Sequence, residues 1–190
     1  MAKKTEPILE LPDEFIVVGA DLSLNRPGFA IIKYENGKAK LEKTTSVDNK
    51  TKKENKTRGM ILCEIEEAIR KLCHQNCIVF FTREASVNNS FFGKRSGTAA
   101  RTGISEVVGV SDLTVWKEKK QEWFELYPTS IKKLITGNGK ATKEDVAKCL
   151  TDYVGDFEYS NDDESDATAV AMAWLIKNDK VKQIEYEKVS

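Results

Sequence analysis

The chain has 190 residues, of which 40% are hydrophobic and 32% are charged, and its 30 basic and 30 acidic side chains leave no net charge. This length suits one domain with a single core, and no apolar run is long enough to cross a bilayer. The composition therefore excludes a membrane-spanning chain. The N-terminus also lacks the order of segments of a signal peptide, so we expect a cytoplasmic protein.

Charge is unevenly distributed along the chain. Residues 38–58 hold eight basic side chains against three acidic ones, whereas residues 152–166 hold seven acidic side chains and no basic one. A basic segment is typical of polyanion binding, and a concentration of carboxylates suits a cation. Solvated loops of opposite sign explain the same pattern equally well.

The N-terminal part of the chain predicts three antiparallel strands. After a loose polar arm over residues 1–14, a run that is apolar apart from one glycine predicts a buried strand over residues 15–20. Turn-forming residues follow, and a second apolar run predicts a strand over residues 29–34. Asn36-Gly37 is a strong hairpin signal, so we expect a third strand over residues 40–47.

The middle of the chain predicts a helix, a strand and a glycine-rich helix. Apolar residues recur at three- and four-residue steps over residues 56–75, which is typical of an amphipathic helix. A fourth buried strand over residues 77–81 ends at Thr82-Arg83-Glu84. Residues 89–110 place glycines among apolar residues at helical spacing, which predicts a closely packed helix and is our choice for a subunit contact. Residues 111–121 are polar and predict a loop or a helix end.

The C-terminal part predicts a short strand and three helices. Residues 123–127 predict the fifth strand, and Pro128 begins a helix that ends at a glycine-rich turn. Thr142 caps the next helix, and an acidic loop covers residues 152–161. The last helix begins near Asp163, and its run of small residues predicts a close approach to the sheet.

Two thiols and the only histidine stand together at Cys73, His74 and Cys77. A structural zinc site needs four ligands, and no second Cys/His pair follows. Free thiols at a helix end and in a strand are therefore the favoured interpretation.

Four acidic residues stand at the ends of the predicted elements. Asp21 and Glu84 follow apolar strands, and Asp163 and Asp166 lie one turn apart at the start of the last helix. Like charges at close range are unfavourable unless a cation neutralises them, and oxygen-only ligands suit Mg²⁺ or Mn²⁺. Two such ions about 3.5–4 Å apart can activate water and stabilise a leaving oxygen in phosphodiester cleavage. The acids therefore predict a metal-dependent nuclease site.

The order of the elements resembles the RNase H-like fold, and more closely the RuvC family of Holliday junction resolvases. The motifs that carry the resemblance are Gly19-Ala20-Asp21 with Gly28-Phe29-Ala30, Arg83-Glu84, the stretch from Ile131 to Lys143 around Thr136-Gly137-Asn138-Gly139, and Asp163-Glu164-Ser165-Asp166-Ala167. The resemblance implies an α/β fold with a mixed five-stranded sheet that opens with three antiparallel strands and is flanked by helices. It implies a nuclease domain over residues 15–178 and a C-terminal tail over residues 179–190.

The same resemblance implies the roles of six site residues. Asp21, Glu84, Asp163 and Asp166 would bind two Mg²⁺ ions, for which Mn²⁺ can substitute, and Lys132 and Lys143 would lie near the scissile phosphate. A fixed ammonium group suits a transition state that gathers negative charge, although exposed helix charges are the alternative for both lysines. Asp162 and Glu164 are expected to point elsewhere.

The expected partners are branched DNA, above all four-way junctions, and a second copy of the chain. A two-fold junction presents two equivalent phosphates, so a homodimer would nick both strands symmetrically and leave 5′-phosphate and 3′-hydroxyl ends. The expected DNA contacts are Lys50, Lys52, Lys53, Lys56, Arg58, Phe91, Phe92, Lys94, Arg95, Arg101, Lys133 and Lys140. No membrane contact is expected, and a helicase partner stays unknown.

Some features depart from the family pattern. The family usually has an aromatic residue three positions after the strand glutamate, where this chain has Val87, and Phe91 and Phe92 are the alternatives for that role. The basic loop and the N-terminal arm also differ from shorter cellular members. These differences resemble phage-encoded members, which would act in the cytoplasm of a bacterial host.

Other interpretations explain less. Gly137-Asn138-Gly139-Lys140 lacks the first glycine and the final Ser or Thr that a phosphate-binding loop requires. The related actin-like kinases need further glycine-rich segments, for which a chain of this length has little room. A non-catalytic protein that binds branched DNA is the stronger alternative, but it leaves the four acids unexplained.

Overall fold

The computed structural model describes residues 11–49, 56–85 and 98–186, with side chains in the last range from residue 102. The strands are β1 (Glu14–Asp21), β2 (Gly28–Glu35), β3 (Lys38–Ser46), β4 (Val79–Glu84) and β5 (Phe124–Leu126). The helices are α1 (Arg58–Cys73), α2 (Thr98–Lys119), α3 (Pro128–Thr136), α4 (Lys143–Val154) and α5 (Asp162–Lys177).

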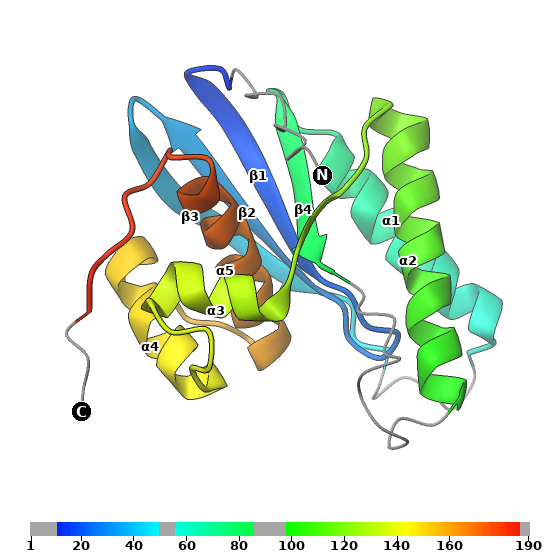
Figure 1. Cartoon of the computed structure of the whole chain (residues 1–190). Helices are drawn as coiled ribbons and strands as arrows, with labels where there is room; N and C mark the ends of the chain where they lie inside the picture. The colour runs from blue at the N-terminus through cyan, green and yellow to red at the C-terminus, as the bar shows by residue number, and fades with distance from the viewer. Residues whose placement is uncertain (1–10, 50–55, 86–97, 187–190) are drawn as a thin grey trace, which may run out of the picture.

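The strands form one mixed sheet in the order β3-β2-β1-β4-β5. β1, β2 and β3 pair antiparallel, whereas β4 pairs parallel with β1 and with β5. α1 and α2 lie on one face of the sheet, and α3, α4 and α5 lie on the other (Figure 1). The expected five-stranded mixed sheet with an antiparallel opening is confirmed.

β1 is buried on both faces, which explains its uninterrupted apolar sequence. Phe15 and Val17 belong to the core beneath α5, whereas Ile16 and Val18 belong to the core beneath α1 and α2. Trp174 of α5 anchors the first of these cores. Its ring stacks on Phe80 of β4 at 5.2 Å and meets Phe15 edge-on at 6.1 Å.

α5 lies unusually close to the sheet because two glycines leave room for its backbone. A Cβ atom on Gly19 of β1 would lie 2.2 Å from the carbonyl oxygen of Ala167. A Cβ atom on Gly28 of β2 would lie 2.2 Å from the carbonyl oxygen of Asp163. The predicted close approach of the last helix is therefore a backbone contact at both positions.

Residues 111–121 do not form a loop, because α2 continues to Lys119. The alternative prediction, a helix end, fits only the last residues of this range. The polar residues there satisfy their hydroxyl groups within the helix. Ser111 Oγ donates to Val108 O at 2.7 Å, and Thr114 Oγ1 donates to Val110 O at 2.7 Å. Both side chains are buried, so their polarity does not end the helix.

Smaller differences concern element boundaries. α4 runs through Val154, so the acidic loop begins later than expected from residue 152. Cys77 precedes β4 instead of lying in it, and all four cysteines are free thiols. The part of the expected tail that is described packs against the domain, where Tyr186 Oη donates to Cys149 O at 3.1 Å.

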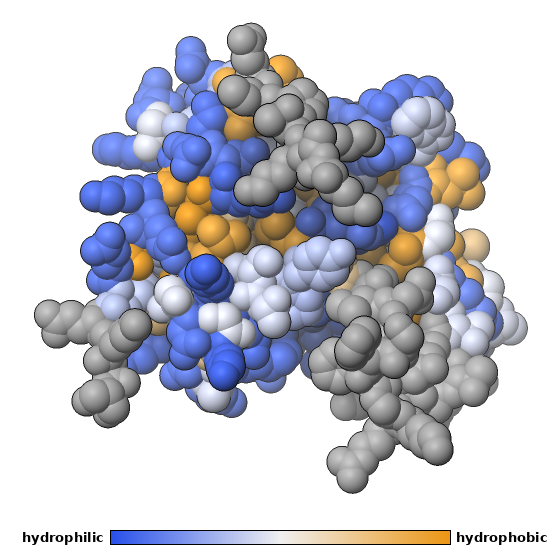
Figure 2. Space-filling model, viewed as in Figure 1, coloured by the Kyte–Doolittle hydropathy of each residue, from blue (hydrophilic) through white to orange (hydrophobic). Residues whose placement is uncertain are grey.

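The surface is polar around a band of apolar residues. Hydrophobic residues gather across the middle of the face shown in Figure 2, between largely hydrophilic upper and lower parts. Large exposed apolar side chains include Leu113 and Trp116 of α2, and Tyr127 before α3. In the described residues, no helix is both long enough and apolar enough to cross a membrane.

Candidate active site

The first two acids stand side by side at the carboxyl ends of neighbouring parallel strands. The register of β1 and β4 pairs Ala20 with Arg83, so the next residues on the two strands, Asp21 and Glu84, emerge at the same end of the sheet. In open α/β sheets, ligands bind outside the carboxyl ends of the strands. The fold therefore places both carboxylates where a site is expected.

The other two acids reach this place through α5. On β2, Gly28 is the register partner of Asp21, and the missing side chain of Gly28 admits the backbone of Asp163. Asn161 caps the helix by accepting the backbone N–H of Glu164 at 3.2 Å. Asp166 lies one helical turn after Asp163 and on the same side. The start of α5 thus faces the ends of β1 and β4.

The carboxyl groups of the cluster influence one another's pKa values. Burial raises the pKa of Asp21 to about 7, and the charges of Asp166, Glu84 and Asp163 contribute in that order. Burial and then the charge of Asp166 raise the pKa of Glu84. Burial also raises the pKa of Asp163. Ionising these groups together is unfavourable without a nearby cation.

Two lysines from α3 and α4 supply positive charge beside the acids. The Lys143 ammonium forms an ion pair with Asp166, and the pKa of Lys143 is raised mainly by this hydrogen bond. Lys132 Nζ donates to Ala141 O at 2.6 Å and its charge acts on Glu84. A capping box between Thr142 and Asp145 fixes the first turn of α4, where Lys143 stands.

The four acids fit a divalent cation, because all the groups that they offer to a metal are carboxylate oxygens. Their negative charges also repel one another, which contributes to the raised pKa of Asp21. Within the described ranges, however, no three Asp, Glu, His or Cys side chains are placed to hold one ion together. Asp166 is instead paired with the Lys143 ammonium. Lys143 and the metal would therefore compete for the same carboxylate.

Glu164 lies between two of the acids in sequence but turns away from them, as expected. It is 3% exposed and accepts hydrogen bonds from Thr44 Oγ1 at 2.7 Å and from Ser46 Oγ at 3.0 Å, both on β3. Its role as an anchor of α5 on β3 was not predicted. No sequence signal revealed it, because these partners lie more than 100 residues away.

Arg26 is a further basic residue that sequence reasoning missed. It stands in the turn between β1 and β2, and its charge acts on Asp163 by lowering the pKa of that carboxyl group. Arg26 Nη2 also forms an ion pair with Asp48 Oδ2 at 3.7 Å. Its place five residues after Asp21 was the available signal.

The expected DNA contacts are only partly described. Lys56 pairs with Glu64, and Arg58 pairs with Glu106, so both cations are already engaged within the chain. Lys133 of α3 and Lys140, which precedes α4, are exposed. The remaining expected contacts lie outside the described residues or side chains, and they are Lys50, Lys52, Lys53, Phe91, Phe92, Lys94, Arg95 and Arg101. Val87, where the family usually has an aromatic residue, lies outside them too.

Comparisons with known proteins agree on one family. The family model described as crossover junction endodeoxyribonuclease RuvC matches residues 17–174. The protein of that name from Brachyspira hyodysenteriae is 28% identical over 164 residues, which cover 86% of this chain and 95% of the relative. The one from Synechocystis sp. is 32% identical over 120 residues, which cover 62% of this chain and 68% of the relative.

A solved structure has the same fold. T. thermophilus RuvC, in complex with a Holliday junction substrate, matches with a TM-score of 0.70 and 19% identity. The match covers 83% of this chain and 91% of that one. The RNase H-like architecture expected from the resemblance is therefore confirmed.

Proposed function

This chain belongs to the RuvC family of crossover junction endodeoxyribonucleases, and we propose from this premise that its four clustered carboxylates form the active site. Membership makes the chain a metal-dependent, structure-selective endonuclease that acts on Holliday junctions. A non-catalytic binding protein of the same fold is not favoured. The finer assignments below are ours.

The observation that carries the site assignment is the convergence of two strand ends and one helix start. The register of β1 with β4 brings Asp21 beside Glu84, and the contact at Gly28 brings Asp163 to the same end of the sheet. The raised pKa of Asp21 has the other three carboxylates among its causes. We propose that these four residues hold two Mg²⁺ ions, with Mn²⁺ as a substitute.

Bound Mg²⁺ would supply Lewis-acid activation of water and stabilisation of the leaving oxygen. Asp21, Glu84, Asp163 and Asp166 would hold the ions, and the other three acids all act on the charge of Asp21. Lys132 and Lys143 would hold the scissile phosphate and stabilise charge as it develops there. Cleavage would leave 5′-phosphate and 3′-hydroxyl ends that a ligase can join.

A matched set of substitutions tests this site on a labelled four-way junction. We expect Asp21→Asn and Asp166→Asn to lower the single-turnover cleavage rate in Mg²⁺ by at least about 100-fold, while junction binding survives. Asp162→Asn is the control, because Asp162 is an exposed acid in the same helical turn and should leave the rate unchanged. Wild-type cleavage by Asp166→Asn would contradict the assignment.

We further propose that the enzyme acts as a homodimer and nicks paired strands symmetrically. The exposed apolar side chains of α2, including Leu113 at 54% and Trp116 at 50% exposure, support this helix as the subunit contact. The contact would thus extend beyond residue 110. Sedimentation at assay concentrations tests this proposal, and a monomer that still cuts both strands at once would contradict it.

DNA affinity is expected to come mainly from phosphate contacts and to fall steeply with salt. Among the expected contacts that the structure describes, Lys133 of α3 and Lys140 before α4 are exposed and unpaired with any acid of the site, so they are the candidates. Their joint replacement by alanine should weaken junction binding and flatten its salt dependence. A DNA substrate of this kind also supports a place in the cytoplasm of a bacterial cell.

A further inference from the structure

Arg83 is a buried cation directly before Glu84 in sequence. The whole residue is 5% exposed. Side chains alternate along a strand, and Phe81 of β4 belongs to the core beneath α1 and α2, whereas Phe80 packs on the core beneath α5. Arg83 shares the face of Phe81, so its guanidinium lies on the opposite side of the sheet from α5 and the acids that α5 carries.

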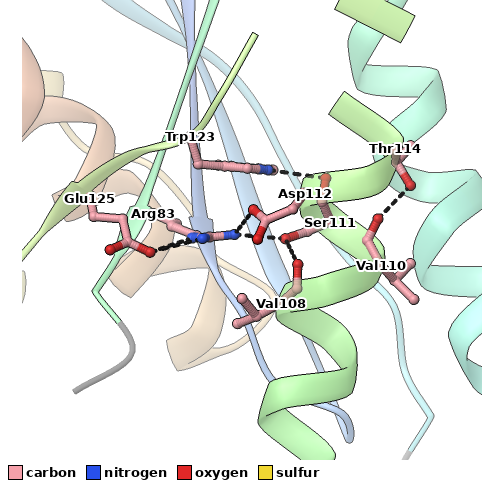
Figure 3. A network of polar contacts seen from close by, with 8 residues as sticks. All are labelled: Arg83, Val108, Val110, Ser111, Asp112, Thr114, Trp123 and Glu125. Carbon is pink, nitrogen blue, oxygen red and sulfur yellow. Dashed lines mark hydrogen bonds and ion pairs between the residues drawn. The ribbon is translucent and has the colours of Figure 1, made fainter. Parts of the chain in front are cut away.

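The guanidinium joins three elements, as Figure 3 shows. Its Nε and Nη2 donate to Glu125 Oε1 of β5 at 3.1 and 2.8 Å. Its Nη1 donates to Ser111 Oγ at 2.9 Å and to Asp112 Oδ1 at 2.5 Å, both on α2. The network ties the end of β4 to a helix and to the neighbouring strand.

Trp123 completes the network from the segment before β5. Its indole Nε1 donates to Ser111 O at 3.1 Å, and its ring lies 5.7 Å from the Arg83 guanidinium carbon. Arg83 also lines a cavity of about 710 Å³ together with residues of α2 and β5. The guanidinium therefore faces α2 and β5, on the side of the sheet away from α5.

The end of β4 is otherwise held by β5, where Phe124 O accepts a hydrogen bond from Thr82 Oγ1 at 3.1 Å. Its pairing with β1 ends at Ala20 and Arg83, and β5 contributes three paired residues. Glu84 is the last residue of the strand. The backbone N–H of the next residue, Ala85, donates to Leu126 O at 2.8 Å. Arg83 adds to these strand contacts a side-chain link from the residue before Glu84 to α2.

We propose that Arg83 is a positioning residue for junction cleavage, which holds the end of β4 so that Glu84 keeps its place beside Asp21. This inference rests on the proposed function, in which Glu84 binds metal. Removal of a group that orients a metal ligand typically costs 10–100-fold in metal affinity or activity. Lysine cannot replace the arginine, because one ammonium does not span the carboxylates on both sides as the planar guanidinium does.

The test measures single-turnover cleavage of a labelled four-way junction against Mg²⁺ concentration. We expect Arg83→Met to raise the Mg²⁺ concentration for half-maximal cleavage by about 10-fold or more, with junction affinity in EDTA within about twofold of wild type. Arg83→Lys should recover little of this loss. Glu125→Gln should shift the Mg²⁺ dependence in the same direction but less, and it covers the case in which Arg83→Met does not fold.

Two further variants separate the possible outcomes. Thr114→Val removes a buried hydrogen bond of α2 without touching Arg83, so it should lower the melting temperature and leave the Mg²⁺ dependence unchanged. Wild-type Mg²⁺ dependence in Arg83→Met, or an equal shift in Thr114→Val, would overturn the role of Arg83. Glu84→Gln tests the premise independently, because wild-type cleavage by that variant would contradict the proposed site itself.

Discussion

The four carboxylates are held by two regions that are built differently. Asp163 and Asp166 start a helix whose backbone touches the sheet at Gly19 and Gly28. Glu84 instead ends a strand that is fixed by a polar network around Arg83. The contacts that place Asp163 and Asp166 are the same contacts that pack α5 on the sheet. The position of Glu84 depends instead on the polar side chains around Arg83.

This difference explains where stability and activity should separate. The α5 contact is made by backbone atoms at van der Waals distance, so any side chain added there displaces the whole helix. The Arg83 network ends on Asp112 and Glu125, whose side chains are 51% and 46% exposed and can return to water. Substitutions in the α5 region should therefore lower stability and cleavage together, and those around Arg83 should lower cleavage more than stability.

The largest effect is expected for Gly28→Ala. The added Cβ atom would lie 2.2 Å from Asp163 O, so α5 must move, and overpacking of this kind costs about 1–3 kcal/mol or more. Thermal unfolding and junction cleavage should both show the loss. Gly109→Ala is the control, because the added atom meets nothing within 4 Å and should stabilise α2 by up to about 1 kcal/mol. Unchanged cleavage by Gly28→Ala would break the comparison.

A smaller loss is expected for Glu164→Gln. The amide keeps one acceptor but turns an NH₂ group toward the hydroxyl donors of β3, which should cost about 1–3 kcal/mol of unfolding free energy. Urea unfolding measures this change. Cleavage should fall in proportion to stability, unlike the cleavage of Arg83→Met. A variant that is fully stable but inactive would place Glu164 in the site itself.

The smallest effect has the opposite sign and concerns Asp21. Burial and the neighbouring acids raise the pKa of Asp21 from 3.8, the value expected for the unfolded chain, to about 7 in the folded, metal-free protein. Between these two pH values the folded state therefore binds more protons than the unfolded state. Stability must therefore fall as pH rises from about 4 to about 7. After allowance for partial solvent exposure, Asp21→Asn should gain on the order of 1–2 kcal/mol at pH 8.

The stability gain of Asp21→Asn should disappear near pH 4. At that pH, Asp21 is protonated in the folded wild type, so it is as uncharged as the asparagine of the variant. Melting temperatures in EDTA across this pH range check the prediction. Added Mg²⁺ should stabilise the wild type and not the variant, since ligands stabilise the state that binds them. A variant that melts below the wild type at pH 8 in EDTA would contradict the repulsion among the acids.

Much of the fold could be predicted because its signals are local. Asn36-Gly37 marked the hairpin between β2 and β3, where both residues have positive φ, and the small residues of α5 indicated a close approach. The end of α2 was missed because Ser111 and Thr114 look like loop residues until their hydroxyls are seen to bond within the helix. Local polarity is therefore a weak guide to where a long helix ends.

The acids of the proposed site were predicted from their places at strand and helix ends, and the structure brings them to one end of the sheet. The residues that support them could not be predicted in the same way. Glu164 meets a partner 120 residues away, and Arg83 meets partners about 30 and 40 residues away. Neither spacing follows a helical or strand period, so only the tertiary fold reveals these anchors.

The most direct test of the account counts metal ions on the junction-bound enzyme. Electron paramagnetic resonance can measure Mn²⁺ bound to the wild type and to Asp21→Asn, each with a four-way junction made uncleavable at its scissile phosphates. We predict two Mn²⁺ ions per wild-type chain and loss of metal binding in Asp21→Asn, with Asp162→Asn unchanged. Equal Mn²⁺ binding by Asp21→Asn and the wild type would contradict the central claim that these carboxylates hold the catalytic metal.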